Sequence, residues 1–149
     1  ATLILALAYC INTITKSMGA ADFLLGVCES WMTPALFLSV AFIAGSVISF
    51  FTGSSWGTFA ICIPIAVPMA YSFTGGQLGT LVYAAVGAVV SGGLFGDHCS
   101  PVSDTTVLSS LGAACDHIDH VRTQLPYALL AAAVSIILWI VVALVGGAV

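Results

Sequence analysis

Apolar residues run through this chain in stretches about as long as a membrane is thick, and short polar interruptions separate them. A bilayer core of about 30 Å is crossed by about 20 residues of α-helix. Residues 127–148 match such a span, and residues 1–15 match the end of another. Because the chain begins inside an apolar run, we expect a piece of a longer protein. The pattern predicts an all-α integral membrane protein in which residues 1–149 form a single membrane domain.

Residues 17–33 are apolar but carry Asp22 and Glu29, and they end near Trp31. Tryptophan is enriched at the headgroup level of membranes, where amphipathic segments also lie. This segment is therefore expected to be interfacial.

Residues 34–73 consist of two apolar stretches on either side of "TGSSWGT", residues 52–58. Pro34 suits the start of a helix, whereas Pro64 and Pro68 make the second stretch a poor continuous helix. We interpret this unit as a re-entrant hairpin, with two thin spans as the alternative. Irregular backbone at membrane depth is tolerated only where protein buries it or where it lines a water-filled cavity.

The segment 77–115 is predicted to be a broken transmembrane helix, because "GDHCSPVSDTTVLSS" interrupts it at residues 96–110. We expect the first half to end near Phe95 and helicity to resume near Thr105, with Ser103 or Asp104 as the N-cap. Four residues oppose helix continuation: Gly92, Gly93, Gly96 and Pro101. Small residues also recur at every fourth position, a stripe that would let another helix approach closely: Ala84, Ala88, Gly92 and Gly96.

Composition supports a membrane protein, since 60% of the residues are hydrophobic and only 5% are charged. Soluble domains carry about a quarter charged residues. The net charge is −4, with two basic residues against six acidic ones. A nucleic-acid surface needs a dense basic patch and is excluded. The five cysteines form no CxxC pair and mostly act as small hydrophobic residues, and no cofactor is expected.

Two carboxylates, Asp97 and Asp104, lie inside the broken helix, where each would cost about 2.5–3.5 kcal/mol at the centre of a membrane helix. They must therefore face protein, water or a cation. Hard cations prefer oxygen ligands, and free carbonyl ends of broken helices suit a cation such as Na⁺. The candidate ion-binding residues of the two breaks are Asp97, Ser100, Ser103, Asp104, Thr105, Thr106, Ser54, Ser55 and Thr58.

Two such breaks that meet near the bilayer midplane would form the site of a secondary active transporter. Competition of Na⁺ and H⁺ for one carboxylate suffices for exchange. We expect Asp104, with hydroxyls on both sides, to be this carboxylate rather than Asp97. We expect a transporter and not an enzyme.

Other interpretations stay open at this point. Residues 96–106 could be a water-exposed loop, and a channel would need symmetric subunits around an open path. A metal enzyme could draw ligands from two groups, although adjacent residues rarely all reach one metal. His117 and His120 fit a solvated helix end, with a pH sensor as the alternative. The two candidate metal-ligand groups are Asp97, His98, Cys99 and Asp104, and Cys115, Asp116, His117, Asp119 and His120.

Two motifs carry a family resemblance: "SSWGTFAICIPIAVPMA" and, about 30 residues later, "GLFGDHCSPVSDTTVLSS". They resemble the carboxy-terminal part of the NhaC-type sodium/proton antiporters of the ion-transporter superfamily, and "CDHIDHVRTQLPYAL" resembles a sub-branch. The resemblance implies Na⁺/H⁺ exchange, or exchange of small carboxylates coupled to Na⁺ and H⁺. It implies two inverted repeats, each with a re-entrant hairpin and a broken helix, and this chain would be most of the second repeat.

The same resemblance implies a multi-pass protein of a cell membrane, in particular a prokaryotic plasma membrane, with residues 116–126 in the cytoplasm. The expected partners are Na⁺, H⁺, the lipid bilayer and the first repeat of the same protein, and a homodimer stays open. The better-known branch has Lys-Met where this chain has His98-Cys99. Because this exchanges a fixed cation for a titratable group, His98 is the candidate for tuning the pH range.

Overall fold

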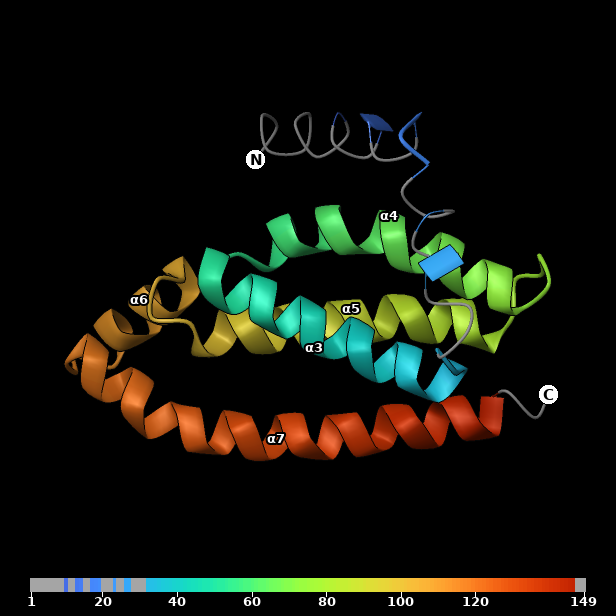
Figure 1. Ribbon diagram of the computed structural model, residues 1–149. Helices are drawn as coiled ribbons and strands as arrows, with labels where there is room; N and C mark the ends of the chain where they lie inside the picture. Colours follow the sequence, from blue (N-terminus) through green and yellow to red (C-terminus); the bar gives the residue numbers. More distant parts are fainter. Residues whose placement is uncertain are drawn as a thin grey trace.

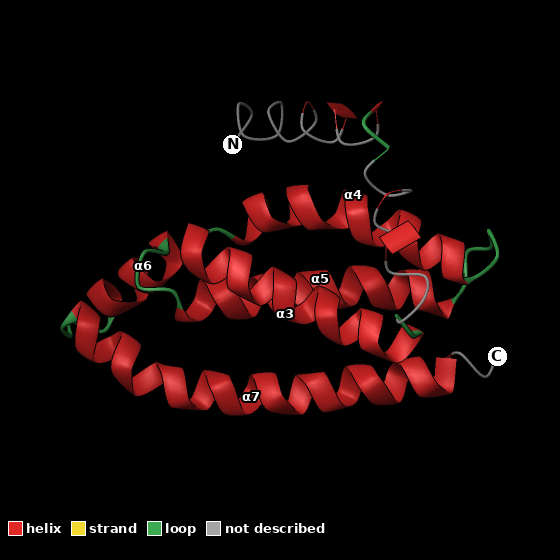
Figure 2. Cartoon of the chain, in the orientation of Figure 1, coloured by secondary structure: helices red, strands yellow, loops and turns green. Residues whose placement is uncertain are grey.

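The computed structural model in Figure 1 is a bundle of long helices. It describes residues 32–146 without a gap and, ahead of them, residues 10, 13–14, 17–19, 23 and 26–27. The expected spanning end at 1–15 and the interfacial segment at 17–33 therefore fall largely outside the described residues. Within 32–146 every element is a helix, as Figure 2 shows. The helices are α3 (Pro34–Thr52), α4 (Ser55–Phe73), α5 (Thr80–Cys99), α6 (Asp104–Gly112) and α7 (His117–Gly146).

Four described helices are long and apolar enough to cross a membrane: α3, α4, α5 and α7. The first two have 19 residues each, or about 28 Å at 1.5 Å per residue. The all-α multi-pass architecture is thus confirmed. Both arms of the unit 34–73 are longer than the short arms expected, and its re-entrant path stays a prediction.

Helix α3 begins and ends where its sequence favours it. Pro34 occupies the first turn, and the side chain of Thr33 accepts a hydrogen bond from the Leu36 amide at 3.3 Å. Gly53 closes the helix in the left-handed conformation, with φ at 65°, which glycine adopts at little cost. A two-residue turn then leads directly into α4.

The expectation that Pro64 and Pro68 would interrupt the second stretch is wrong, because α4 runs through both. Each proline removes one backbone donor, but apolar helices tolerate this where local adjustments and neighbouring helices satisfy the freed carbonyls. The continuity of α4 therefore depends on its neighbouring helices and not on the two prolines alone.

Helix α5 lies at the centre of the bundle and contacts α3, α4 and α7. Its small-residue stripe packs against α3, as predicted: a Cβ atom on Gly92 would overlap the Phe42 carbonyl, and one on Gly96 would overlap the Ser46 carbonyl. The glycines were also expected to end the helix near Phe95, and this was wrong. Each glycine costs about 1 kcal/mol of helix propensity, but here glycine is what lets the two backbones approach.

Helix α7 is one continuous helix of 30 residues, about 45 Å long. The last span was expected at 127–148, but the helix already begins at His117 and passes through Pro126. Residues 147–149 lie outside the described part. Trp139 fixes α7 to α5, because its Nε1 donates to the Ser91 hydroxyl at 3.2 Å and its ring lies where a Cβ on Gly87 would be.

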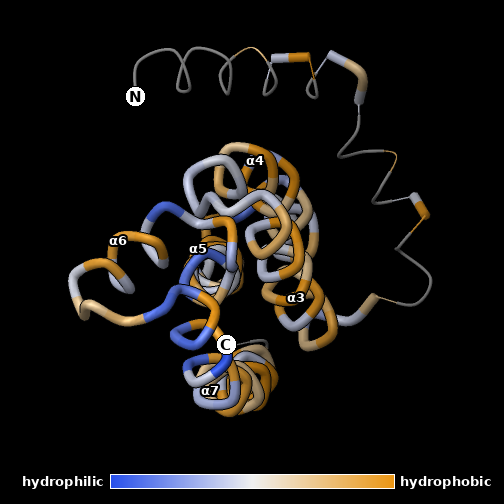
Figure 3. Tube along the Cα trace, turned by 90° about the vertical axis from the view of Figure 1, so that its left-hand side faces the viewer, coloured by the Kyte–Doolittle hydropathy of each residue, from blue (hydrophilic) through white to orange (hydrophobic). Residues whose placement is uncertain are grey.

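The turn between α3 and α4 lies at the same end of the bundle as α6 and the start of α7 (Figure 1). Figure 3 looks at this end, and hydrophilic residues gather there at the end of α5, around α6 and at the start of α7. The opposite end carries the α4–α5 turn. Within residues 32–146, the fold therefore collects the charged residues at one end of the bundle, between Asp97 and Arg122.

Candidate functional site

The break after α5 is a short loop of residues 100–103. Helix α5 ends at Cys99, one turn beyond the expected Phe95, and Ser103 is the N-cap of α6, accepting from the Thr105 amide at 3.2 Å. Ser103 was one of the two expected caps. The loop is also tied to α3, because the Ser100 hydroxyl donates to the Phe50 carbonyl at 2.6 Å.

The turn between α3 and α4 touches this loop. A Cβ on Gly53 would lie 2.8 Å from the Val102 carbonyl oxygen and 3.0 Å from the Ser103 nitrogen, closer than real Cβ contacts come. Only glycine allows both the positive φ and this approach. The two breaks that the sequence identified therefore lie against each other.

Asp97 is the centre of the polar cluster where the breaks meet. Its side chain is buried, with 7% exposure. Its Oδ2 accepts from the Ser55 hydroxyl at 3.1 Å, and its Oδ1 accepts from the Ser103 hydroxyl at 2.6 Å. Each carboxylate oxygen is thus bonded by a hydroxyl from a different break.

A third hydroxyl extends this cluster. The Oγ atoms of Ser103 and Thr105 lie 2.8 Å apart. Because the Ser103 hydrogen is used on Asp97, the Thr105 hydroxyl is the donor in this pair, and Ser103 accepts it. The result is a chain of hydroxyls from α6 to the carboxylate, in which Ser103 accepts both the Thr105 hydroxyl and the Thr105 amide. The hydroxyl oxygens of Ser55 and Thr105 keep lone pairs that a cation could use.

The other candidate hydroxyls support the backbone around the site. Thr106 donates to the carbonyl oxygens of Asp97 and His98 at 3.3 and 3.2 Å. Thr58, which is fully buried, donates to the Ser54 carbonyl at 3.0 Å, and the Ser54 side chain caps α4 by accepting from the Gly57 amide. With Ser100, they position the two breaks and do not touch the carboxylate.

Asp104 does not join Asp97. It is the first residue of α6 and is exposed to solvent, and the cap position is taken by Ser103. Its placement gives it neither the burial nor the hydroxyl partners that Asp97 has.

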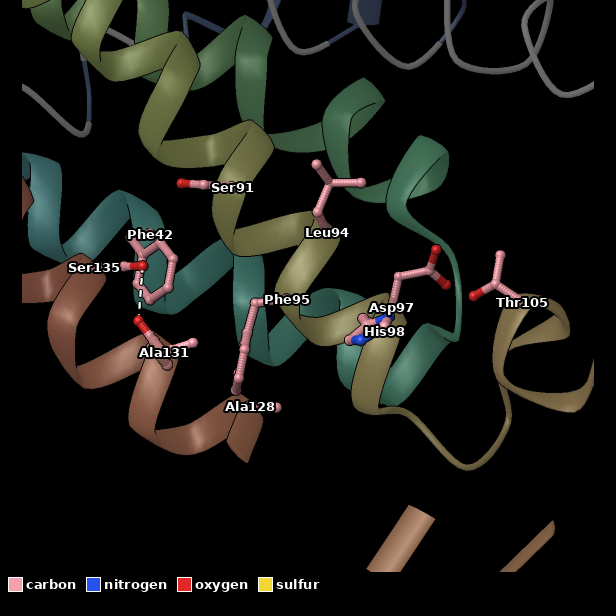
Figure 4. Close-up of a pocket in the computed structure, with 11 residues that line it drawn as sticks. Phe42, Ser91, Leu94, Phe95, Asp97, His98, Thr105, Ala128, Ala131 and Ser135 are labelled. Atoms are coloured by element: carbon pink, nitrogen blue, oxygen red, sulfur yellow. Dashed lines mark hydrogen bonds between the residues drawn. The ribbon is translucent and has the colours of Figure 1, made fainter. Parts of the chain in front are cut away.

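A pocket of about 420 Å³ opens beside Asp97 (Figure 4). His98, which is exposed, lines it together with Thr105, and Phe42 and Phe95 supply aromatic walls. The side contributed by α7 consists of small residues spaced i, i+3, i+4 and i+7: Ala128, Ala131, Ala132 and Ser135.

Sequence reasoning missed this α7 wall, although its spacing in a helix of bulky residues was a readable signal. It also missed the contact of His117 with the loop, where Nε2 lies 2.8 Å from the Pro101 carbonyl oxygen. No signal in the sequence pairs these two residues, because they are 16 positions apart on different elements.

The metal-ligand groups considered from the sequence do not assemble. Within the part of the chain that the structure describes, no three His, Cys, Asp or Glu side chains come close enough together to hold a metal ion. The carboxylate of Asp97 is surrounded by hydroxyl oxygens instead, which are ligands for a hard cation such as Na⁺.

The sequence model of the Na⁺/H⁺ antiporter family matches residues 1–144. An uncharacterized protein of Haemophilus influenzae is 47% identical over 140 residues, which cover 93% of this chain and 26% of that protein. The malate-2H⁺/Na⁺-lactate antiporter of Bacillus subtilis is 37% identical over 114 residues, 76% of this chain and 23% of that protein.

The Na⁺/H⁺ antiporter NhaC of Alkalihalophilus pseudofirmus is 31% identical over 139 residues, 93% of this chain and 29% of that protein. The chain thus spans about a quarter of the length of the curated relatives that it matches. No solved structure matches.

Proposed function

Since the chain belongs to the Na⁺/H⁺ antiporter family, we propose that it is part of a secondary active transporter that exchanges Na⁺ for H⁺ across the membrane. One observation carries this proposal: the buried Asp97 carboxylate accepts one hydroxyl from each of two helix breaks, through Ser55 and Ser103. A family of antiporters points to transport rather than to catalysis. The chain covers about a quarter of its relatives, so the site belongs to a larger protein.

The cluster can exchange the two ions because its hydroxyls can reverse their roles. With no cation bound, Ser55 and Ser103 donate to the carboxylate. A hydroxyl has one hydrogen and two lone pairs, so rotation of Ser55 turns a lone pair toward a cation that Asp97 binds. Ser103 can do the same when it releases one of the two Thr105 donors that it accepts. A proton on Asp97 removes the negative charge that attracts Na⁺, and one site then holds either ion but not both.

Helix ends add to this preference for a cation. Both α3 and α5 end at the breaks, and the carbonyl end of a helix carries partial negative charge. The amide ends of α4 and α6 lie at the same breaks, and both are capped by serine hydroxyls. The capped amide ends attract an anion less than open ones would, whereas the carboxylate attracts a cation directly.

The proposal is tested with the purified full-length protein that contains this chain, reconstituted into liposomes with a pH-sensitive dye inside. An inward Na⁺ gradient should drive protons out without any organic solute present. Absence of Na⁺-dependent proton movement in vesicles that are tight to protons would refute Na⁺/H⁺ exchange as the activity.

A second candidate is exchange of a small organic anion coupled to Na⁺ and H⁺. The observation that favours it is the pocket of about 420 Å³ beside Asp97 and His98, which is far larger than a bare ion needs. A relative 37% identical is named a malate-2H⁺/Na⁺-lactate antiporter. Counterflow of radiolabelled malate or lactate separates the two candidates. If the second is right, the labelled anion is exchanged and proton movement requires the organic anion.

His98 is proposed to tune the pH range, because it is exposed and lines the pocket next to Asp97. A protonated imidazole there repels Na⁺, whereas the neutral ring does not. The His98→Lys variant should behave as if always charged, with a higher apparent KM for Na⁺ at alkaline pH. An unchanged pH profile would remove His98 from this role.

The path through the membrane is a further part of the proposal. We place the turn at Gly53 and Ser54 inside the membrane, as the tip of a re-entrant hairpin, and the site near the midplane of a prokaryotic plasma membrane. The first repeat, inverted relative to this one, would cover the polar end of the bundle. The support is the polar cluster itself, since an ionisable side chain within a membrane segment costs free energy and is retained there mainly for a function.

A further inference from the structure

His117, the first residue of α7, joins three elements around the candidate site. Its ring is half-buried. Nε2 lies 2.8 Å from the carbonyl oxygen of Pro101 in the α5–α6 loop, and Nδ1 lies 3.2 Å from the hydroxyl of Ser110 on α6. Neither contact belongs to the cluster at Asp97, so the ring acts on the loop and not on the ion.

The hydrogens of these contacts can be counted. A carbonyl oxygen only accepts, so Nε2 carries a hydrogen that it donates to Pro101. The Ser110 hydroxyl already donates its single hydrogen to the Val107 carbonyl at 2.8 Å. A neutral ring then has no hydrogen left on Nδ1. The Ser110 hydroxyl must either give up its hydrogen bond to the Val107 carbonyl or place a lone pair against the lone pair of Nδ1. Only the doubly protonated ring donates to both partners while Ser110 keeps its own bond.

The loop held in this way carries the site. Pro101 lies between Ser100, which is bonded to the Phe50 carbonyl, and Ser103, which is bonded to Asp97. We propose that His117 is a positioning residue that clamps the α5–α6 loop, and that protonation of its ring tightens the clamp. Acidification of the solution on the side of the membrane where α7 begins would then hold Ser103 in place. This effect would be independent of the protons that the site transports.

The elements that pack against α7 carry further charged or histidine side chains. These are Asp97 and His98 of α5 and Asp104 of α6. On α7 and just before it, the titratable or charged side chains are Cys115, Asp116, Asp119, His120 and Arg122. Asp116 caps α7 by accepting from the amides of Ile118 and Asp119 at 2.9 and 3.2 Å. The two direct partners of the ring are neutral, so a change in its charge acts through these two bonds.

The clamp is tested by the reactivity of a cysteine in the loop, which does not depend on transport. Val102 is 64% exposed, and a Val102→Cys variant of the full-length protein, with its native cysteines replaced, can be labelled with a hydrophilic maleimide. The rate of labelling is compared with and without His117→Gln at each pH. The pH dependence of the thiol itself is the same in both proteins and cancels in the ratio of the two rates. Glutamine retains a donor and an acceptor but cannot take up a proton.

At pH 5.5 we expect the Val102→Cys protein to be labelled about three- to tenfold faster with His117→Gln than without it, which is the effect of one hydrogen bond. The ratio of these two labelling rates should approach one above pH 8. The matched control is His120→Gln, one turn along α7, for which the ratio should stay at one throughout. The dependence should persist in Asp97→Asn, which removes titration of the proposed ion site. A His117→Gln ratio that does not vary with pH overturns the inference.

The inference rests on the proposed function only for its consequence in transport, and the two fail separately. Na⁺-driven proton movement reports on the exchange, whereas the labelling ratio reports on the clamp. If exchange is absent but the ratio varies with pH, the clamp stands and serves another activity of the same site.

Discussion

At the scale of single residues, the proposed ion exchange depends on hydroxyl groups that switch from donating to Asp97 to binding a cation. Ser55 and Ser103 reach opposite oxygens of the carboxylate, at 3.1 and 2.6 Å. The sequence identified these residues by type, since only short polar side chains fit a break in an apolar helix. It favoured Asp104 over Asp97, whereas the structure buries Asp97 and exposes Asp104, a difference that depends on where α6 turns away from α5.

The hydroxyls themselves are open to a direct test. Ser55→Ala and Ser103→Ala should each raise the apparent KM for Na⁺ about tenfold or more, because each removes an oxygen ligand of the bound cation, a contact comparable to the about 1.5–3 kcal/mol of a hydrogen bond to a charged group. Ser109→Ala is the matched control, since its exposed hydroxyl bonds only to the Thr105 carbonyl of its own helix. If all three variants exchange Na⁺ like the parent protein, these hydroxyls are not ligands.

At the scale of elements, the contact of the two breaks depends on one glycine. Gly53 has φ at 65° and lies against the backbone of Val102 and Ser103. Gly57, in the first turn of α4, has only the Ser54 side chain within reach of an added Cβ, at 3.6 Å. The sequence marks both as parts of one Gly/Ser break, and only the structure distinguishes them.

Gly53→Ala should therefore abolish or strongly reduce exchange, because it combines backbone strain of about 1–3 kcal/mol with a clash against the loop. Gly57→Ala should exchange normally when the two variants are compared at equal expression and equal Tm in detergent. Equal activity of the two variants would show that the breaks need not touch.

Helix boundaries in this chain were predictable where a cap decides them and not where a neighbouring helix does. Pro34 at the start of α3 and Ser103 at the start of α6 follow from local chemistry. The continuity of α4 through Pro64 and of α5 through Gly96 does not, because the gain comes from packing against another helix.

At the scale of the whole molecule, the two ends of the bundle should face opposite sides of the membrane. The turn at Thr74 lies at one end, and Asp119 lies near the start of α7 at the other (Figure 1). Single cysteines at these positions should react with impermeant maleimide from opposite sides of oriented vesicles. Labelling of both from the same side would contradict the arrangement.

The depth of the hairpin is a separate question for the same assay. In a re-entrant hairpin Ser54→Cys lies inside the membrane and should label at least about tenfold more slowly than Asp119→Cys. Asp97 shares its pocket with Ala128, close to the start of the apolar part of α7. If Ser54→Cys labels as fast as Asp119→Cys, α3 and α4 are two full spans and the site lies near the membrane surface.

The most direct test of the central claim compares two carboxylates in the full-length protein. Asp97→Asn keeps the shape and an oxygen acceptor at the site but removes the charge and the proton site, so Na⁺-driven proton movement in proteoliposomes should fall by about two orders of magnitude or more. Asp104→Asn, at the exposed start of α6, should stay within about twofold of the parent protein. Both proteins should retain the parent Tm. Normal exchange by Asp97→Asn, or loss of exchange by Asp104→Asn alone, would contradict the account.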